Sequence, residues 1–399
     1  MRFHGAKDCI YAGWVTSEGD IVVAQLEAER PTVTHVVHQG LDKNDHASPA
    51  LFVDPSGFVT AYYSAHNGSA IFSRTTESPE DITHWQPEIE LVLNRGSAER
   101  NAYTYPTPLE VDHELYLVWR GDFWKPTMAR RTGATEWTAA ETLVMRPGAP
   151  STNRPYFKAV SDGSSFHFAV TDGHPATEPH NSIYYFRRQG DTFLDVRGRS
   201  IGRPAEPLNP ADADVVFDAP ANDHGGWIWD IALDEDGSPV LTYATFPRDD
   251  QHLLCWSKWD GSRWVTREVP ARGGWFPEDP PEGRQTEPYY SGGVVLDHED
   301  PHTMFLSRKT GARFEIEEWR TEDGGQTWVS RPVTAWSSAH NVRPVAIRNH
   351  GGDGPRLMWM RLDGWYRGYK DYRTSILVED PRFEAKRVMS RWMDEKQRP

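Results

Sequence analysis

The 399-residue chain lacks several features that would direct its interpretation elsewhere. It has only two cysteines, Cys9 and Cys255, which cannot form a disulfide framework and which suit a reducing compartment. No segment approaches the roughly 18 apolar residues that a membrane helix requires. The N-terminus lacks the apolar segment of a signal peptide. We therefore expect a cytoplasmic protein with no membrane partner, unless an export leader has been removed.

An excess of positive charge is also missing. Asp and Glu number 58 against 43 Lys and Arg, which gives a formal net charge of −15. Such a surface argues against nucleic acid or an anionic membrane as the main partner. An acidic ligand would need a local basic pocket. The sequence does not indicate the oligomeric state.

Helical periodicity is nearly absent, and short alternating runs take its place. Examples are VTAYYSA at 59–65, ELYLVWRG at 114–121 and PVLTYATF at 239–246. Thirty prolines and 32 glycines supply the turns between such runs, a pattern typical of antiparallel β-sheet. Aromatic residues make up 12% of the chain and include 17 tryptophans, which predicts a folded core rich in large rings.

An aromatic residue that follows a polar turn recurs along the chain. Once two Pro-rich insertions at 202–223 and 268–288 are set aside, its spacing approaches the roughly 40–50 residues of a propeller blade. The recurring residues are Trp85, Trp137, Phe193, Trp264 and Trp328.

The repeat predicts an all-β fold, a seven-bladed β-propeller of four-stranded antiparallel blades closed by the N- and C-terminal segments. The first unit is short of strands, so we expect the last segment to complete it, which removes open sheet edges. We expect one propeller domain over 1–382 and a short C-terminal helix or tail over 383–399. The expected units lie near 8–40, 47–95, 103–145, 155–200, 226–267, 289–335 and 341–380.

One segment is specific for propeller-type folds. Thr321–Trp328 reads TEDGGQTW and matches the Asp-box pattern S/T-x-D-x-G-x-T-W. We expect Asp323 and Gly324 to form a tight turn with Trp328 packed beneath it. This motif is structural and does not identify a reaction.

Polar and aromatic residues break the alternation at the same place in successive units. Each stands just before an inner strand or at the far end of its hairpin, so we expect them to meet on one face of the ring. The residues are His46 and His66; Tyr103, Tyr105 and Arg120; Arg154, Tyr156, Lys158 and His174; and Tyr289, Tyr290 and His298.

The expected pocket is rich in imidazole, phenol, guanidinium and ammonium groups and poor in carboxylates. It therefore offers no obvious pair of acids for glycoside hydrolysis. Arg120 could bind a substrate carboxylate, and a neutral imidazole could take the acidified neighbouring proton. A tyrosine could protonate the leaving oxygen, or act as the base if its pKa is lowered. Together these groups suggest β-elimination from a uronic acid, which leaves an unsaturated product.

Other readings of the same residues stay open. His46 could cap a turn, Arg120 could form a salt bridge between blades, and Tyr105 could serve packing alone. Thiolate and imidazole are also suitable zinc ligands. A metal site would then fall on His224, His252 and Cys255.

Several blocks, in this order, resemble the BNR-4-type seven-bladed propellers, a family that includes ulvan lyases and L-rhamnose-α-1,4-D-glucuronate lyases. The resemblance spans roughly residues 8–380. The blocks are DKNDHASPAL, YYSAHN, TYP followed by VWRGD, RPYFKAVSDG, HFAVTDGHP and YSGGVVLDHEDP.

The resemblance implies a lyase that cleaves a rhamnosyl–glucuronate bond by β-elimination. His46 and His66 match the family's histidine pair, with His66 preferred as the base. Arg120 matches the arginine that neutralises the carboxylate. Tyr105 matches the tyrosine that donates to the leaving oxygen, with Tyr103 as its rival. The residues expected to shape the sugar subsites are Tyr103, Arg154, Tyr156, Lys158, His174 and Tyr290.

The resemblance further implies that the chemistry requires no cofactor, although some members bind structural calcium or zinc. The expected partner is an anionic oligosaccharide or polysaccharide. The net charge of −15 and the missing signal peptide favour short rhamnose-capped or glucuronate-terminated oligomers over polymeric ulvan. The alternatives are an α-L-rhamnosidase that uses His46 and a propeller that binds sugar without catalysis.

Overall fold

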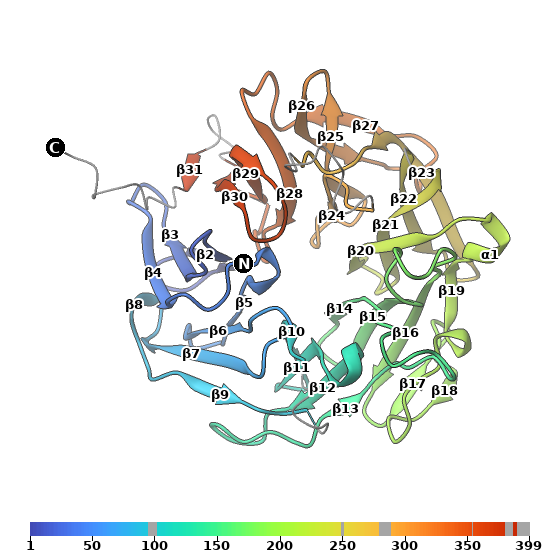
Figure 1. The fold of residues 1–399 in the computed structure, drawn as a ribbon, viewed down its shortest axis with the longest axis horizontal. Helices are drawn as coiled ribbons and strands as arrows, with labels where there is room; N and C mark the ends of the chain where they lie inside the picture. Colours follow the sequence, from blue (N-terminus) through green and yellow to red (C-terminus); the bar gives the residue numbers. More distant parts are fainter. Residues whose placement is uncertain (95–101, 249–250, 279–288, 353, 380–385, 389–399) are drawn as a thin grey trace.

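Seven antiparallel sheets stand around a central axis in the computed structural model (Figure 1). The structure describes residues 1–94, 102–248, 251–278, 289–352, 354–379 and 386–388. The predicted all-β, seven-bladed propeller is therefore confirmed. Helix within the described residues is confined to single turns, namely η1 (Asp45–Ala47), η3 (Asp122–Trp124), η4 (Pro210–Asp212) and α1 (Ala219–Asn222).

The first three blades are built from consecutive strands, each sheet beginning with its innermost strand. Their strands are β1 (Arg2–Phe3), β2 (Cys9–Val15), β3 (Ile21–Leu26) and β4 (Val33–His38); β5 (Ala50–Val53), β6 (Val59–Tyr63), β7 (Ile71–Ser78) and β8 (Asp81–Trp85), with β9 (Ile89–Leu91) also on β7; and β10 (Thr104–Val111), β11 (Glu114–Arg120), β12 (Pro126–Arg130) and β13 (Glu141–Thr142).

The remaining four blades follow the same order. Their strands are β14 (Phe157–Ser161), β15 (Phe166–Thr171), β16 (Ile183–Gln189), β17 (Thr192–Leu194) and β18 (Ser200–Gly202), with β19 (Asp214–Phe217) on β16; β20 (Gly226–Leu233), β21 (Pro239–Arg248), β22 (Gln251–Trp259) and β23 (Trp264–Gly273); β24 (Val294–Leu296), β25 (Thr303–Thr310), β26 (Arg313–Arg320) and β27 (Val329–Pro332); and β28 (His340–Ala346), β29 (Leu357–Tyr366), β30 (Tyr372–Val378) and β31 (Lys386–Val388).

The core lies between neighbouring sheets, so a middle strand is buried on both faces. The first eight residues of β21 are all buried, which explains why this run is apolar almost throughout. Trp119, Trp256 and Trp359 are among the largest fully buried side chains. The expectation that tryptophans pack between blades therefore holds for these residues. It fails for Trp336, which is 100% exposed.

The Asp-box forms the expected turn in the sixth blade. The carboxylate of Asp323 accepts hydrogen bonds from the backbone N–H of Thr327 at 2.8 Å and from its hydroxyl at 2.6 Å. Gly324 and Gly325 have φ of +68° and +79°, a conformation that glycine adopts without steric cost. Trp328 meets Trp256 of the fifth blade edge-on, with ring centroids 6.1 Å apart.

The ring closes where the first blade meets the seventh. Trp14 of β2 and Val22 of β3 share an apolar cluster with Met358 of β29 and Val378 of β30. The backbone N–H of Arg2 also donates to the carbonyl of Arg348 at 2.7 Å. The first sheet, however, needs no strand from the C-terminus, because β1 fills that place. The expectation that the last segment completes the first unit was wrong.

The C-terminal part is described over one short stretch. Residues of β31 pair with β30, so the sheet extends past residue 382. The residues of the expected helix, Met389, Trp392 and Met393, lie outside the described part of the chain. No helix within the described residues is long and apolar enough to cross a membrane.

Ring closure by apolar packing leads to a stability prediction. Replacing Met358 by alanine should lower the free energy of unfolding by about 2–4 kcal/mol, because the side chain is 7% exposed and its removal leaves a cavity. Val329→Ala should change it by less than about 0.5 kcal/mol, because Val329 is 75% exposed. Urea unfolding followed by tryptophan fluorescence measures both. Equal effects would contradict the packing role.

Candidate functional site

The two histidines of the 46–66 hairpin lie on the same face of the ring. His46 lies in η1, just before β5, and His66 follows β6. Because β5 and β6 are antiparallel, the start of one and the end of the other meet at one edge. The two imidazoles stack with centroids 4.3 Å apart and planes inclined by 21°. The predicted convergence of this pair is therefore observed.

The side chain of Asn44 sets the tautomers of both rings. One of its polar atoms accepts a hydrogen bond from the backbone N–H of His46 at 3.1 Å. This atom must be the amide oxygen, because a backbone N–H can only donate. The same oxygen lies 2.7 Å from His46 Nδ1, which therefore carries hydrogen when that ring is neutral. The amide nitrogen lies 3.3 Å from His66 Nδ1 and donates to it. In the neutral state, Nε2 of His46 therefore carries no hydrogen, whereas Nε2 of His66 carries one.

A half-buried carboxylate supports His46 from behind. Asp45 Oδ1 lies 2.6 Å from His46 Nδ1, and the Tyr366 hydroxyl donates to the other oxygen. Burial alone would raise the pKa of Asp45, but His46, with Arg343 and Tyr366, outweighs it and holds that pKa below its usual value. An ionised Asp45 orients the His46 ring through this contact with Nδ1.

Arg120 and Tyr105 come from the next blade. Arg120, the last residue of β11, is 4% exposed and donates to the Tyr156 hydroxyl at 3.2 Å and to Asn67 Oδ1 at 3.0 Å. Its guanidinium lies 4.9 Å from the centroid of the Tyr105 ring. Tyr105 has φ of +60° beside a register shift in β10 and precedes Pro106. Such a bulge re-aims a side chain, here towards Arg120.

Aromatic and imidazole rings continue the site around the axis. Tyr105 lies 6.3 Å from Tyr156, and Tyr156 lies 5.3 Å from Trp227, measured between ring centroids. Trp227 lies 5.6 Å from Tyr290, whose hydroxyl faces His46 Nε2 at 3.3 Å. The contacts therefore close a loop, which we call the site ring. Its members are His46, His66, Tyr105, Arg120, Tyr156, His174, Trp227 and Tyr290.

Three arginines of the site have no carboxylate partner within the described part of the chain. Arg120, Arg154 and Arg343 form no ion pair with a described residue, and the buried Nε of each has no hydrogen-bond partner there. Arg343 lies over the Tyr290 ring at 4.9 Å, and Arg154 acts electrostatically on both His66 and His174. Unpaired guanidiniums in a partly dry site favour an anionic ligand.

Burial keeps His66, His174 and Tyr105 uncharged. Desolvation, aided by His46 and Arg120, lowers the pKa of His66 to about 3. Desolvation, aided by Arg154 and Arg120, lowers the pKa of His174 to about 3 as well. Burial raises the pKa of Tyr105 well above its usual value, although Arg120 opposes this. Near neutral pH the two imidazoles are therefore neutral and the phenol keeps its proton.

Tyr103 is not part of the site, which corrects its assignment as a substrate-binding residue and as the rival of Tyr105. It is fully buried and stacks on Trp119, with centroids 6.0 Å apart. Its hydroxyl accepts hydrogen bonds from the backbone N–H groups of Leu93 at 2.6 Å and Asn94 at 2.5 Å. Tyr103 therefore anchors the chain between blades.

Lys158 and His298 belong to a second polar group. His298 Nε2 lies 2.9 Å from Asp230 Oδ2, and Arg348 contacts the other nitrogen of His298. Burial lowers the pKa of Lys158, while Asp230 opposes this. These residues come from four consecutive blades, the fourth to the seventh. Lys158 was expected in a sugar subsite, but its electrostatic partners are Asp230, Arg348 and Arg343.

The metal candidates do not assemble. His252 and Cys255 are three residues apart on β22 and therefore point to opposite faces of the strand. His224 stacks on Phe217, with centroids 5.4 Å apart, and burial raises the pKa of Cys255 to about 12. Among the described residues, no group of three His, Cys, Asp or Glu side chains could hold a metal ion. The zinc site left open as an alternative therefore does not form on these three residues.

Sequence reasoning missed three residues beside the ring. Arg343, Tyr366 and Tyr369 come from the seventh blade, and Tyr369 meets His46 edge-on at 4.7 Å. Arg343 has φ of +53° beside a register shift in β28. The signal was present in NVRPVA, where a charged residue interrupts the inner strand of the last unit, as Lys158 does in β14 and Asp230 does in β20.

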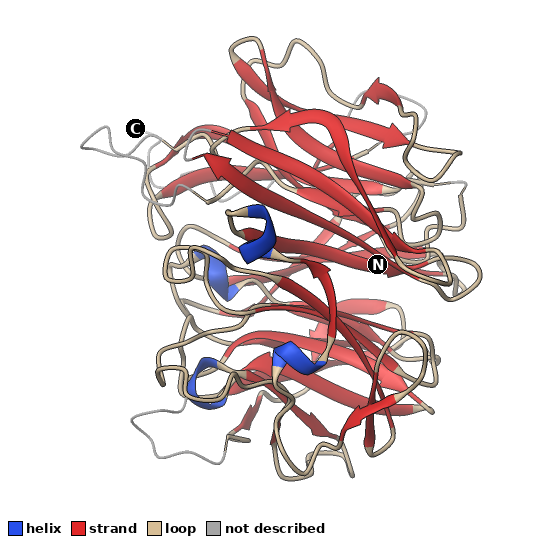
Figure 2. Cartoon of the chain, turned by 90° about the vertical axis from the view of Figure 1, so that its right-hand side faces the viewer, coloured by secondary structure: helices blue, strands red, loops and turns tan. Residues whose placement is uncertain are grey.

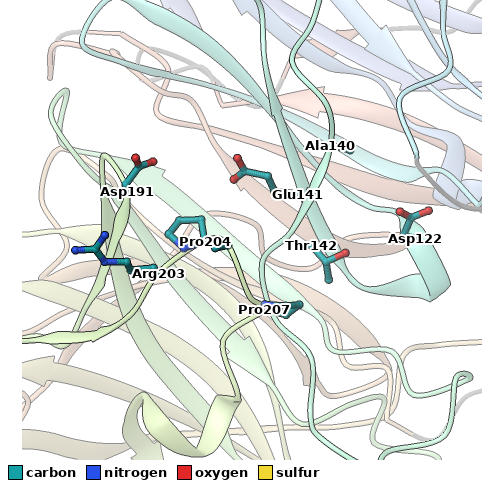
Figure 3. Close-up of a pocket in the computed structure, with 9 residues that line it drawn as sticks. Asp122, Ala140, Glu141, Thr142, Asp191, Arg203, Pro204 and Pro207 are labelled. Atoms are coloured by element: carbon teal, nitrogen blue, oxygen red, sulfur yellow. The ribbon is translucent and has the colours of Figure 1, made fainter.

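A separate hollow of about 460 Å³ lies at the outer strands of the third and fourth blades (Figure 3). Its charged lining residues are Asp122, Glu141, Asp191 and Arg203. It contains no member of the site ring. Because three of its four charged groups are acidic, it does not suit an anionic ligand.

Comparison with known proteins places this chain in a family. The model of the BNR repeat-containing family matches residues 9–272, well over half of the chain. The chain belongs to the BNR repeat-containing family. No curated protein sequence matches it.

Solved structures share the fold at low sequence identity. The polysaccharide lyase Uly1 superposes on this BNR repeat protein with a TM-score of 0.61 and 12% identity, over 95% of this chain and 89% of its own. A hypothetical selenium-binding protein from Sulfolobus tokodaii gives a TM-score of 0.55 and 11% identity, over 96% and 90%. These similarities establish the propeller fold.

The different environments of Tyr103 and Tyr105 give opposite mutational outcomes. Tyr103→Phe should destabilise the protein by about 1–3 kcal/mol, because two buried N–H groups lose their acceptor. It should leave ligand affinity unchanged. Tyr105→Phe should have little effect on stability but should alter the site. Thermal unfolding together with ligand titration separates the two, and loss of binding in Tyr103→Phe alone would reverse the assignment.

The neutral state of His174 predicts acid sensitivity. In the folded protein its pKa is about 3, against an ordinary value of 6.5. The unfolded chain therefore binds protons first, and stability present above pH 6.5 is lost as the pH falls towards 3. His174→Gln cannot titrate and should lose about 2 kcal/mol less between pH 7 and pH 5. Urea unfolding at both pH values measures this, and an unchanged pH slope would contradict it.

Proposed function

We propose that this protein is a polysaccharide lyase that cleaves a rhamnosyl–glucuronate linkage by β-elimination. The observation that carries the proposal is the group of three arginines that form no ion pair with a described residue, beside an imidazole whose Nε2 carries no hydrogen. The fold shared with the polysaccharide lyase Uly1 supports it. The family resemblance of the histidine, tyrosine and arginine motifs supports the rhamnosyl–glucuronate linkage.

Arg120 is assigned to bind the uronate carboxylate. Its hydrogen bonds to Asn67, Thr104 and Tyr156 fix the guanidinium, while its buried Nε has no partner among the described residues. A carboxylate held against this cation draws charge from the adjacent carbon and acidifies the C5 proton. Fixed cations in a poorly hydrated site stabilise the developing enolate more strongly than water does.

His46 is assigned as the base, although the sequence led us to prefer His66. Because the Asn44 amide oxygen holds the hydrogen on Nδ1, Nε2 of His46 carries none and accepts from the Tyr290 hydroxyl at 3.3 Å, which the C5–H of the substrate would have to displace. Nδ1 of His66, in contrast, accepts the amide N–H of Asn44. Asp45 lies behind Nδ1 and compensates the positive charge that the ring gains. His66 is then a neutral ring on which the His46 imidazole stacks.

Tyr105 is assigned as the acid. Its raised pKa keeps the phenol protonated, which suits a donor and not a base. In the proposed step the C5–H bond breaks and its proton goes to His46 Nε2. The electron pair forms the C4–C5 double bond, the C4–O bond breaks, and the leaving oxygen takes the proton of Tyr105.

The carboxylates beside the ring do not favour hydrolysis by an acid pair. Asp45 is held by His46 and Tyr366, and Asp42 accepts the backbone N–H of His66 at 3.0 Å. Both are engaged in holding the histidines. Glycoside hydrolysis by two carboxyl groups requires an acid and a base placed on either side of the bond.

The ultraviolet absorbance of an unsaturated uronate tests the proposal directly. With a rhamnosyl–glucuronate oligomer as substrate, the wild type should produce this absorbance. Arg120→Lys should lower kcat/KM about 100- to 1,000-fold, because one fixed donor to the developing charge changes its geometry. His46→Gln should lower it about 100- to 10,000-fold, and His66→Gln should lower it less.

Met358→Ala is the stability control, because Met358 lies outside the site ring. At temperatures at which this variant stays folded, its kcat/KM should equal that of the wild type. Release of rhamnose without new absorbance would show that the protein is a rhamnosidase and not a lyase. Binding of the oligomer without formation of either product would show that the propeller binds carbohydrate without catalysis. A larger loss of activity in His66→Gln than in His46→Gln would reverse the assignment of the base.

A further inference from the structure

Trp336 is exposed in a way that packing does not explain. It is 100% exposed, the highest value among the exposed large hydrophobic side chains of the described residues. Its backbone also has φ of +57°, a conformation that bulky residues rarely adopt and that costs free energy. A fully solvated indole on strained backbone contributes nothing to the core.

The loop that carries Trp336 is held rigidly by a buried carboxylate. Glu315 of β26 is 5% exposed. It accepts hydrogen bonds from the Thr334 hydroxyl at 2.6 Å, from the backbone N–H of Ser337 at 2.8 Å and from Asn341 Nδ2 at 3.1 Å. Anchors on both sides of Trp336 keep the indole presented to solvent.

Trp336 lies on the face of the propeller that carries the site ring. It lies between the end of β27 and the start of β28. Site residues occupy the equivalent connections in other blades, such as His46 before β5 and Tyr290 before β24. Figure 2 shows the ring turned by 90°, with the short helical turns in blue and the loops between strands in tan. Trp336 and Arg343 are seven positions apart in the chain, a span of at most about 25 Å.

The surroundings of Trp336 are polar. Arg361 donates to the Ser338 hydroxyl at 3.4 Å, and Arg313 lies 3.3 Å from His340 Nε2. Specific protein interfaces bury roughly 800 Å² on each partner around a dry apolar centre. A single indole among hydroxyl, imidazole and guanidinium groups does not provide such a centre. It does suit a sugar, whose C–H face packs on an indole while its hydroxyls and carboxylate meet polar groups.

We propose that Trp336 forms an outlying sugar subsite that binds a distant unit of the saccharide held by the site ring. The ligand is a further sugar of the same anionic chain, stacked on the indole, with Arg313 near its charged groups; Arg361 is already paired with Asp363 at 3.3 Å. This inference rests on the proposed function for the choice of saccharide. It predicts that affinity rises with chain length until the chain reaches the seventh blade.

Calorimetric titration with rhamnosyl–glucuronate oligomers of increasing length tests the subsite. The protein used is His46→Gln, which prevents turnover during the titration. Adding Trp336→Ala should weaken binding of the longest oligomer about tenfold or more and leave binding of the disaccharide unchanged. Trp336→Phe should retain most of the affinity. Val329→Ala, at the opposite end of β27, is the matched control and should change nothing.

The outcomes separate this inference from the proposed function. Equal affinity of the Trp336→Ala and parent proteins for every oligomer overturns the subsite, whether or not the wild type is a lyase. Length-dependent binding that needs Trp336, without any ultraviolet product from the wild type, supports the subsite and overturns the lyase. A wild type that neither binds nor cleaves the oligomers overturns both.

Discussion

The geometry of the site depends on closure of the ring. Each inner strand begins on the same face, and the apolar contact between the first and seventh blades holds all of these starts around one axis. His46, Tyr105 and Tyr290 are distant in sequence, yet each needs only to stand at the start of its own inner strand to meet the others. A site of this kind cannot form from a part of the ring, because six of the seven blades contribute to it or adjoin it.

Within that frame, the amide of Asn44 divides the roles of two otherwise similar imidazoles. The backbone N–H of His46 fixes the amide's orientation, and the amide then fixes one hydrogen on each ring. The two rings therefore differ in chemistry although they stack in near-parallel contact. Burial adds a second distinction, because it holds His66 neutral through the physiological range.

The sequence was sufficient for the fold and for seven of the eight members of the site ring; Trp227 is the member that it missed. Alternating runs, the recurring outer-strand aromatics and the Asp-box reflect local geometry, which short segments encode. The hairpin of His46 and His66 was predictable for the same reason.

The separation of Tyr103 from Tyr105 was not predictable, because residues two apart on a regular strand share a face. The bulge and the left-handed backbone at Tyr105 break that rule. Arg343 was missed through a similar bulge in β28, and the Asn44 hydrogen bonds depend on the folded positions of three side chains.

The three site arginines, which form no ion pair with a described residue, have a consequence for how salt acts on the molecule. The protein as a whole carries a charge of −15, so it repels an anion that is still many ångströms away. The cations of the site attract the same anion only over contact distances. Ionic strength screens the distant repulsion more than the partly buried contacts, because the Debye length is about 8 Å at physiological salt. Moderate salt should therefore hasten the arrival of an anionic ligand, the opposite of the behaviour of proteins with a basic surface.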